Sequence, residues 1–169
     1  MGLIYLDNAA TSFPKPRCTV QAMARVLEES GANPGRAGHR LSLEAGRIVE
    51  RCRQALADML GETDASRVAF AQNATDALNM AIHGAVHTGD HVVSTLMEHN
   101  SVLRPLSELA RSGIITLTLV PPDADGRIHA QEIERALTAR TRLVAMTHMS
   151  NVLGLEQDVA SAGAVCRRR

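Results

Sequence analysis

The sequence is poor in lysine and in aromatic residues. Among 169 residues it has a single lysine, Lys15, no tryptophan, one tyrosine and two phenylalanines, whereas 17 arginines supply the rest of the positive charge. So few aromatic rings exclude the stacking platforms on which single-stranded nucleic acids bind. The 18 basic residues are balanced by 18 acidic ones, so no excess charge is available to displace counterions from nucleic acid or to attract an anionic membrane. We therefore expect neither kind of partner.

Cysteines and long apolar runs are also scarce. The three cysteines, Cys18, Cys52 and Cys166, are odd in number and widely spaced, so the sequence indicates neither a disulfide framework nor a zinc site. No run of about eighteen apolar residues occurs, and the amino terminus lacks a basic region followed by an apolar one. We expect a cytoplasmic protein that holds no metal.

Apolar periodicity predicts alternating helices and strands. Helices are expected over residues 17–29 and from Ser42, as N-cap, to Leu60, and the second carries an apolar stripe expected to be core, Cys52 included. Beyond it, strands are expected at 67–71, 91–96, 114–120 and 142–147, and helices at 74–86, 101–112, 130–138 and from about Asp158. This alternation is typical of βαβ units, and so of an α/β fold with a mainly parallel sheet and helices on both faces.

Ligands of open α/β sheets bind at the carboxyl ends of the strands, and the first such segment is residues 72–76. It opens an expected helix, so its backbone N–H groups and the Thr75 hydroxyl can hold a phosphate. The same residues fit ordinary capping, with Asn73 as N-cap and Asp76 three residues later. The Asp76 carboxylate would repel a phosphate unless it points away, so both interpretations stay open.

Three further loops carry polar side chains that could face a ligand. His99 follows the expected strand at 91–96, where its imidazole could stack on a ring or transfer a proton, although a loop histidine is more often merely solvated. The segment 148–154 follows the strand at 142–147 and fits either a site or a hydrogen-bonded loop. The opening segment at 7–12 is polar and too short for a regular element.

Motifs of several other enzyme classes are missing. The segment GANPGRAGHR matches neither GxGxxG nor GxxxxGK[ST], so nicotinamide and nucleoside triphosphate sites lack their usual support. No GxSxG nucleophile elbow of a serine hydrolase is present. His83, His87 and His91 are spaced four apart, but residues 88–90 would break a helix before the third. We do not expect them to align as metal ligands.

Five segments, in this order and at these intervals, resemble the amino-terminal half of one enzyme family: YLDNAATSFPKP, GANPGRAGHRLS, FAQNATDALN, LMEHNSVLRP and THMSNVLG. The family is that of the cysteine desulfurases and selenocysteine lyases, class V aminotransferase-like enzymes that use pyridoxal 5′-phosphate (PLP). The resemblance covers residues 4–158. It implies the large domain of the PLP-dependent transferase fold type I, a three-layer α/β sandwich with a mainly parallel sheet.

The resemblance implies roles for individual residues. Ala74 and Thr75 would hold the PLP phosphate. His99 would stack on the pyridine ring and is a candidate for proton transfer. Asn151 would lie near the phenolic oxygen of the ring and the substrate carboxylate.

Two earlier segments complete the implied site. Asn8 and Ala9 would line the substrate pocket. Arg36 and His39 belong to a loop that approaches the active site in the family, but the letters GRAGH differ from the arrangement in some branches. The resemblance therefore assigns no role to these two residues.

The resemblance also implies residues that this sequence does not contain. The Schiff-base lysine of the family lies downstream of THMSNVLG, as do the aspartate that pairs with the pyridine nitrogen, the carboxylate-binding arginine and the nucleophilic cysteine. Lys15, between two prolines, matches no lysine motif. We expect residues 1–40 to be an amino-terminal segment with active-site loops and residues 41–169 to be a partial PLP-binding domain, truncated before that lysine.

The implied activity is that of a cysteine desulfurase, which converts L-cysteine to L-alanine and passes the sulfur to an enzyme cysteine as a persulfide. As an amino-terminal fragment the chain is expected to be inactive alone, and the full-length parent is expected to be a homodimer. Alternatives are another class V aminotransferase or lyase, a non-catalytic remnant that binds PLP, or a folding partner for a separate carboxyl-terminal chain. The downstream reading frame would discriminate among them.

Overall fold

The computed structural model describes residues 3–35 and 38–169. The chain forms two compact units, one up to Phe70 and the other from Ala71 onward, and each is described by itself. No helix among the described residues is both long and apolar enough to cross a lipid bilayer. The domain division expected after residue 40 stays a prediction.

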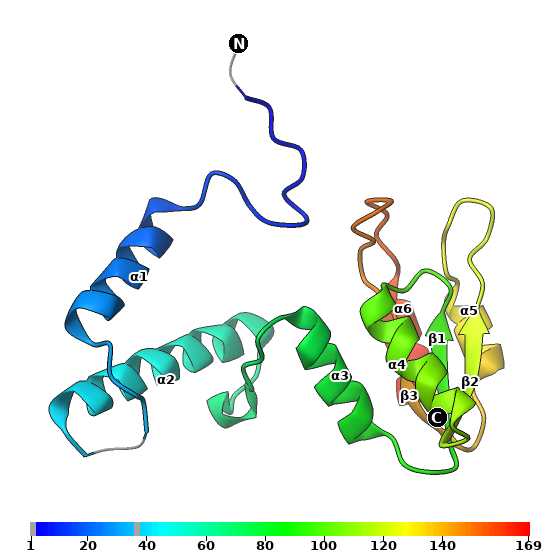
Figure 1. The fold of residues 1–169 in the computed structure, drawn as a ribbon. Helices are drawn as coiled ribbons and strands as arrows, with labels where there is room; N and C mark the ends of the chain where they lie inside the picture. Colours follow the sequence, from blue (N-terminus) through cyan, green and yellow to red (C-terminus); the bar gives the residue numbers. More distant parts are fainter. Residues whose placement is uncertain (1–2, 36–37) are drawn as a thin grey trace. The chain divides into compact units, whose positions relative to one another are not determined.

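The first unit contains two α-helices and a short 3-10 helix (Figure 1): α1 at Arg17–Glu29, α2 at Arg40–Leu60 and η1 at Ala65–Arg67. Both α-helices were expected, but Ser42 is not the N-cap of α2. His39 takes that position, and its Nδ1 accepts the backbone N–H of Ser42 at 3.2 Å. The Ser42 side chain is buried and its hydroxyl donates to the carbonyl of Asn33 at 2.9 Å. The helix begins at Arg40, two residues before Ser42, so Ser42 lies inside its first turn.

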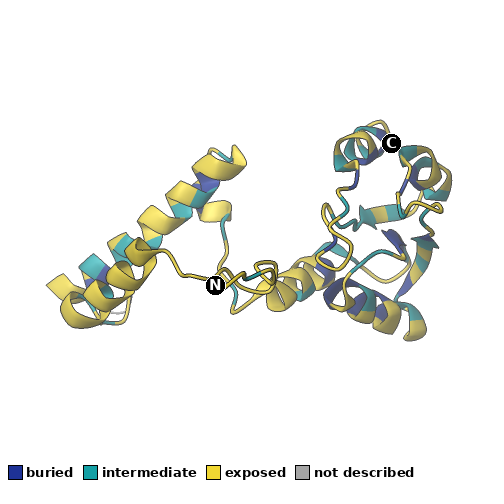
Figure 2. Ribbon diagram, turned by 90° about the horizontal axis from the view of Figure 1, so that it is seen from above, coloured by how far each residue is buried: buried dark blue, intermediate teal, exposed yellow. Residues whose placement is uncertain are grey.

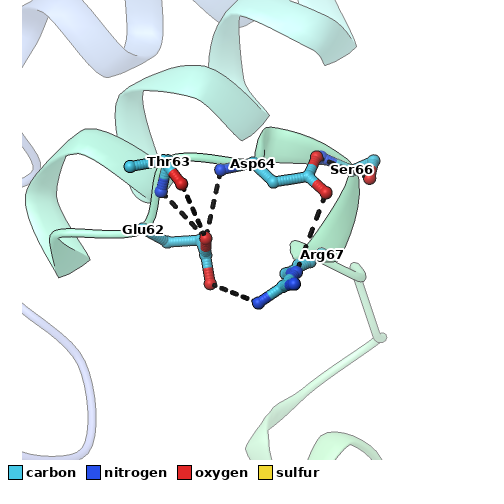
Figure 3. Close-up of polar contacts among 5 residues, drawn as sticks. All are labelled: Glu62, Thr63, Asp64, Ser66 and Arg67. Carbon is cyan, nitrogen blue, oxygen red and sulfur yellow. Dashed lines mark hydrogen bonds and ion pairs between the residues drawn. The ribbon is translucent and has the colours of Figure 1, made fainter.

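The strand predicted at residues 67–71 is wrong, because η1 and irregular chain occupy this segment. Side chains satisfy the local backbone instead (Figure 3). The Asp64 carboxylate accepts the N–H of Ser66 at 3.0 Å, and the Glu62 carboxylate accepts that of Asp64 at 3.1 Å. Arg67 lies 3.4 Å from Glu62. In the segment itself, the N–H groups of Arg67 and Val68 donate to the carbonyls of Asp64 and Ala65, so these two donors are not available to a neighbouring strand.

The chain after η1 is held by Arg53 of α2. Its guanidinium donates to the carbonyl of Val68 and lies 5.0 Å from the centroid of the Phe70 ring. A carbonyl that accepts from a charged donor is less available to a sheet. Arg53 thus contacts Val68 and Phe70 where a neighbouring strand was expected, and Phe70 stays exposed.

The apolar stripe of α2 is buried only in part (Figure 2). Ala45 is buried, whereas Cys52, Met59 and Leu60 are exposed. The prediction that Cys52 belongs to the core is therefore wrong. η1 packs against α2 in this unit, but its three residues are too few to cover a helix of 21 residues.

The second unit is an α/β fold with a parallel sheet, as predicted (Figure 1). Its strands are β1 at Asp90–Thr95, β2 at Ile115–Val120 and β3 at Thr141–Val144. Its helices are α3 at Ala74–Ala85, α4 at Asn100–Arg111, α5 at Ala130–Ala136 and α6 at Val159–Arg167. The described strands lie in the order β2-β1-β3, and both pairs are parallel. Consecutive strands are joined through a helix, which is the usual connection in a parallel sheet.

Helices cover both faces of this sheet and make three layers. Val92 and Val93 of β1 are fully buried and point to opposite faces, because side chains alternate along a strand. The cluster around Val92 joins the sheet to α3 and α4 through Ile82, Val102, Leu106, Leu109 and Ile115. The cluster around Val93 joins it to α5 and α6 through Val120, Ile128, Ile133 and Ala162. β1 is thus the best buried strand, and its carboxyl end lies between two layers of helices.

β3 is shorter than the predicted range of 142–147. Just beyond its end, Ala145 still bonds to β1, and its carbonyl accepts the Ser94 hydroxyl at 3.0 Å. The N–H of Thr147 donates to a side chain instead, the carboxylate of Glu98. Side-chain partners thus replace the ladder where the carboxyl ends of β1 and β3 meet.

Candidate functional site

The start of α3 is capped and still offers free donors. Asn73 is the N-cap, and its Oδ1 accepts the backbone N–H of Asp76 at 2.9 Å. Asp76 in turn accepts the N–H of Gln72 at 3.3 Å, so the capping interpretation is confirmed. None of the hydrogen bonds among the described residues uses the N–H groups of Ala74 and Thr75. Capping and phosphate binding therefore draw on different donors at this helix end.

His99 caps α4 with its side chain. Its Nδ1 accepts the backbone N–H of Ser101 at 3.1 Å and lies 2.8 Å from the Ser101 hydroxyl. A ring nitrogen that accepts a hydrogen bond carries no proton, so this pattern assigns the proton of the neutral imidazole to Nε2. No hydrogen bond among the described residues uses Nε2, and the side chain is exposed. The imidazole thus offers a donor to a ligand from an oriented ring.

Thr75 and His99 line one groove of about 500 Å³ between α3 and α4. The two helices pack against each other and against the same face of the sheet. Arg104 lines the groove as well, and the acidic side chain there, Glu108, pairs at 2.8 Å with Arg111 on its own helix. No motif in the sequence singled out Arg104, because only the packing of the two helices brings it beside Thr75.

Glu98, the residue before His99, also escaped the sequence analysis. Its Oε1 accepts the backbone N–H of Thr147 at 2.7 Å and the Thr95 hydroxyl at 2.8 Å. Burial raises the pKa of this half-buried carboxyl because it disfavours the charged form, and the two hydrogen bonds oppose the rise. The carboxylate joins the carboxyl ends of β1 and β3, from which the loops with His99 and Asn151 begin.

Asn151 lies in a tight hairpin after β3, in the same unit as α3 and α4. Ser150 shapes the turn, since its hydroxyl accepts the N–H of Val152 at 3.3 Å and its carbonyl that of Gly154 at 2.7 Å. The loop interpretation is confirmed for Ser150. Asn151 is exposed and does not line the α3–α4 groove. Because β1 and β3 are parallel, this hairpin and His99 leave the sheet at the same edge.

Asn8 and Ala9 belong to the first unit. The Asn8 side chain donates to the carbonyl of Tyr5 at 3.3 Å and accepts the N–H of Phe13 at 3.1 Å, so it shapes its own loop. Ala9 is exposed. The amine of Lys15 donates within the same loop, to a backbone carbonyl at 2.6 Å. These contacts account for the polar character of the opening segment.

Other residues that the sequence analysis singled out either stabilise the fold or lie outside the described residues. Arg36 lies outside it, and His39 caps α2. His91 is buried at the start of β1, with Nδ1 2.8 Å from the hydroxyl of Thr141 and Nε2 2.9 Å from that of Thr118. Burial lowers its pKa. Among the described residues no three side chains are grouped as metal ligands.

Comparisons with known proteins place the chain in a family of PLP-dependent enzymes. Residues 4–169 match the family Aminotransferase class-V. Similar curated proteins include the cysteine desulfurases IscS of Haemophilus ducreyi, 33% identical, and of Pasteurella multocida, 34% identical. Each match covers 98% of this chain and 42% of the relative. The chain belongs to the Aminotransferase class-V family.

Solved structures share the fold. An apo cysteine desulfurase from Thermococcus onnurineus NA1 matches with a TM-score of 0.88 and 32% identity, over 98% of this chain and 41% of that one. SspA in complex with cysteine matches with a TM-score of 0.88 and 30% identity, over 97% of this chain and 47% of that one. The chain thus spans less than half the length of these proteins. The predicted family and the predicted α/β fold are confirmed.

Proposed function

We propose that this chain supplies the phosphate- and ring-facing part of a PLP-dependent cysteine desulfurase. The observation that carries the proposal is the α3–α4 groove, which brings Thr75 at the start of α3 beside the imidazole of His99. Relatives named as cysteine desulfurases support the choice of reaction, and a structural neighbour described in complex with cysteine supports the choice of substrate.

The side chains and backbone of this site fit PLP. A phosphate requires N–H and hydroxyl donors, and the free N–H groups of Ala74 and Thr75 with the Thr75 hydroxyl offer them at the positive end of the α3 dipole. His99 would stack on the ring and could donate or move the proton at Nε2. Asn151, in its hairpin, would lie near the phenolic oxygen of the ring and the substrate carboxylate. When bound, PLP supplies an electron sink for bond cleavage next to the amino group of the substrate.

The proposed substrate is L-cysteine, and Asn8 and Ala9 are proposed to line its pocket. A cysteine thiolate of the whole enzyme would attack the sulfur of the substrate, and the bond from that sulfur to the β-carbon would break. L-Cysteine loses one sulfur atom and becomes L-alanine, while the thiolate gains that atom and becomes a persulfide. None of the three cysteines in this chain is proposed as the nucleophile.

We further propose that the 169 residues by themselves do not complete this reaction. The family binds its cofactor to a lysine, and the single lysine here, Lys15, is engaged within its own loop. PLP bound to this chain would therefore be held noncovalently, mainly through its phosphate. For the whole protein we propose a homodimer in the cytoplasm.

Titration of the chain with PLP and with pyridoxal tests the site. We expect PLP to bind and pyridoxal, which lacks the phosphate, to bind roughly ten times more weakly or worse, because charge-assisted hydrogen bonds are lost. The absorbance of the two compounds reports both affinities. Equal affinity for the two compounds, or an adduct on Lys15 trapped with borohydride, would contradict the proposal.

A further inference from the structure

The Glu98 side chain joins the loop after β1 to the chain after β3, beyond the ladder of the two strands. The last backbone bond between the two strands runs from the N–H of Ala145 to the carbonyl of Val93 at 2.9 Å. Two residues later, the N–H of Thr147 donates to Glu98 Oε1 at 2.7 Å. Among the described residues this is the hydrogen bond that ties the β1–α4 loop to the chain after β3. The Ser94 hydroxyl donates to the carbonyl of Ala145 and the Glu98 carboxylate accepts the N–H of Thr147, so two side chains replace backbone bonds beyond the ladder.

The same oxygen is anchored to the sheet by a buried threonine. Thr95 Oγ1 donates to Glu98 Oε1 at 2.8 Å and accepts the N–H of Met97 at 3.1 Å. Thr95 is fully buried, so this turn is fixed before α4 begins. The two groups that donate to the carboxylate are neutral. Burial raises its pKa by more than these hydrogen bonds lower it. A half-buried carboxylate without a described cationic partner is costly, and its two hydrogen bonds are what offset that cost.

We propose that Glu98 is a positioning residue that holds His99 and the Asn151 hairpin in one fixed relation. His99 follows Glu98 directly, and Asn151 lies four residues after Thr147, so the carboxylate constrains both loops close to the side chains in question. This inference rests on the proposed function, because it takes both side chains to face one cofactor. Glu98 acts through the two loops and does not itself touch cofactor or substrate.

Two substitutions in the full chain separate this role from a general loss of structure. Glu98→Ala removes the acceptor, whereas Glu98→Gln keeps an oxygen at Oε1 for the same two donors. Glu132→Ala is the control, because Glu132 is exposed on α5 and pairs there with Arg135. We expect amide hydrogen exchange at Thr147 to be roughly ten- to a hundredfold faster in E98A, as for the loss of one hydrogen bond to a charged group. E98Q and E132A should stay close to the parent, and exchange at Val93 should not change.

Two further measurements test whether the hydrogen bond from Thr147 to Glu98 affects the proposed PLP site. In nuclear magnetic resonance spectra, the ring signals of His99 and the side-chain amide signals of Asn151 should shift in E98A and return in E98Q. PLP affinity should fall in E98A and recover in E98Q. If the parent chain binds no PLP, the proposed function fails, while the exchange rates and the resonances still decide the role of Glu98.

Three results would overturn the inference. Unchanged exchange at Thr147 in E98A would show that the bond does not hold the loop. An E98Q variant that behaves like E98A would show that the oxygen acceptor is not what matters. Faster exchange at Val93 as well as at Thr147 would show that Glu98 serves the stability of the whole sheet.

Discussion

The Nδ1 atom of His99 accepts the backbone N–H of Ser101 at 3.1 Å, so a single imidazole both caps α4 and lines the α3–α4 groove. A proton on Nδ1 and this capping bond exclude each other, because both would need the same lone pair. While the cap is intact, the proton that the ring can offer is the one on Nε2. The helix start thereby orients the ring and selects its reactive nitrogen.

Replacing His99 should separate capping from ligand binding. His99→Ala should lower the free energy of unfolding by about 0.5–2 kcal/mol, the usual effect of losing an N-cap. His99→Asn should lower it less, because asparagine is a good N-cap, yet PLP affinity should fall in both variants since neither keeps the ring. Urea unfolding and PLP titration measure the two effects. An equal loss of stability in the two variants would argue against the capping role.

The Thr75 hydroxyl should contribute directly to PLP affinity. Thr75→Ala removes one hydrogen bond to a charged phosphate, which is worth about 1.5–3 kcal/mol, so the dissociation constant should rise by roughly ten- to a hundredfold. Ser107→Ala, at an exposed position of α4 outside the groove, is the matched control. A titration in which T75A binds PLP as tightly as S107A would remove Thr75 from the site.

The 169-residue chain should show no desulfurase activity with L-cysteine and PLP. The reason is that its single lysine, Lys15, is bonded within its own loop. Assays for alanine and for sulfide check this, with a complete cysteine desulfurase assayed in parallel. Formation of alanine that is abolished by His99→Ala would show that the chain is catalytically competent.

Acid should weaken the second unit through His91. Burial lowers the pKa of His91 below its unperturbed value of 6.5, so near that pH the unfolded chain binds a proton that the folded chain does not. The free energy of unfolding should therefore fall as the pH drops through about 6.5 and level off below the folded pKa. His91→Gln should lose this step in urea unfolding, and His83→Gln, at an exposed site, should keep it. A step of equal size in both variants would assign it to another group.

Glu98 should change the free energy of unfolding with pH in the opposite direction to His91. In the folded state the pKa of Glu98 is raised above its unperturbed value of 4.5. Between that value and the folded pKa, the folded state binds more protons than the unfolded state, so the contribution of Glu98 to stability falls as the pH rises through the folded pKa. Glu98→Gln cannot ionise. The unfolding free energy of E98Q minus that of the parent should therefore increase with pH. A difference for E98Q that stays constant would mean that burial does not shift this carboxyl.

Local patterns predicted most of the second unit. The strand expected at 91–96 is β1 with a shift of one residue, and the helix expected at 74–86 is α3. Apolar spacing predicts both elements, and a polar residue at the start of the helix marks where α3 begins. These signals involve residues only a few positions apart, so the sequence shows them directly. The prediction of a strand at 67–71 is wrong because a residue distant in the sequence contacts this segment. Arg53, in a preceding helix, takes the carbonyl of Val68.

The sequence by itself determined the family, the α/β class and the residue types proposed to hold a phosphate and a ring, since five motifs and the periodicity of apolar residues are local properties of the chain. Tertiary structure alone decided which of these residues meet. Thr75 and His99 share a groove because α3 and α4 pack on one face of the sheet. Glu98 reaches Thr147 across 49 positions of sequence because two parallel strands end side by side. Contacts of this kind depend on strand order and helix packing, which no local pattern encodes.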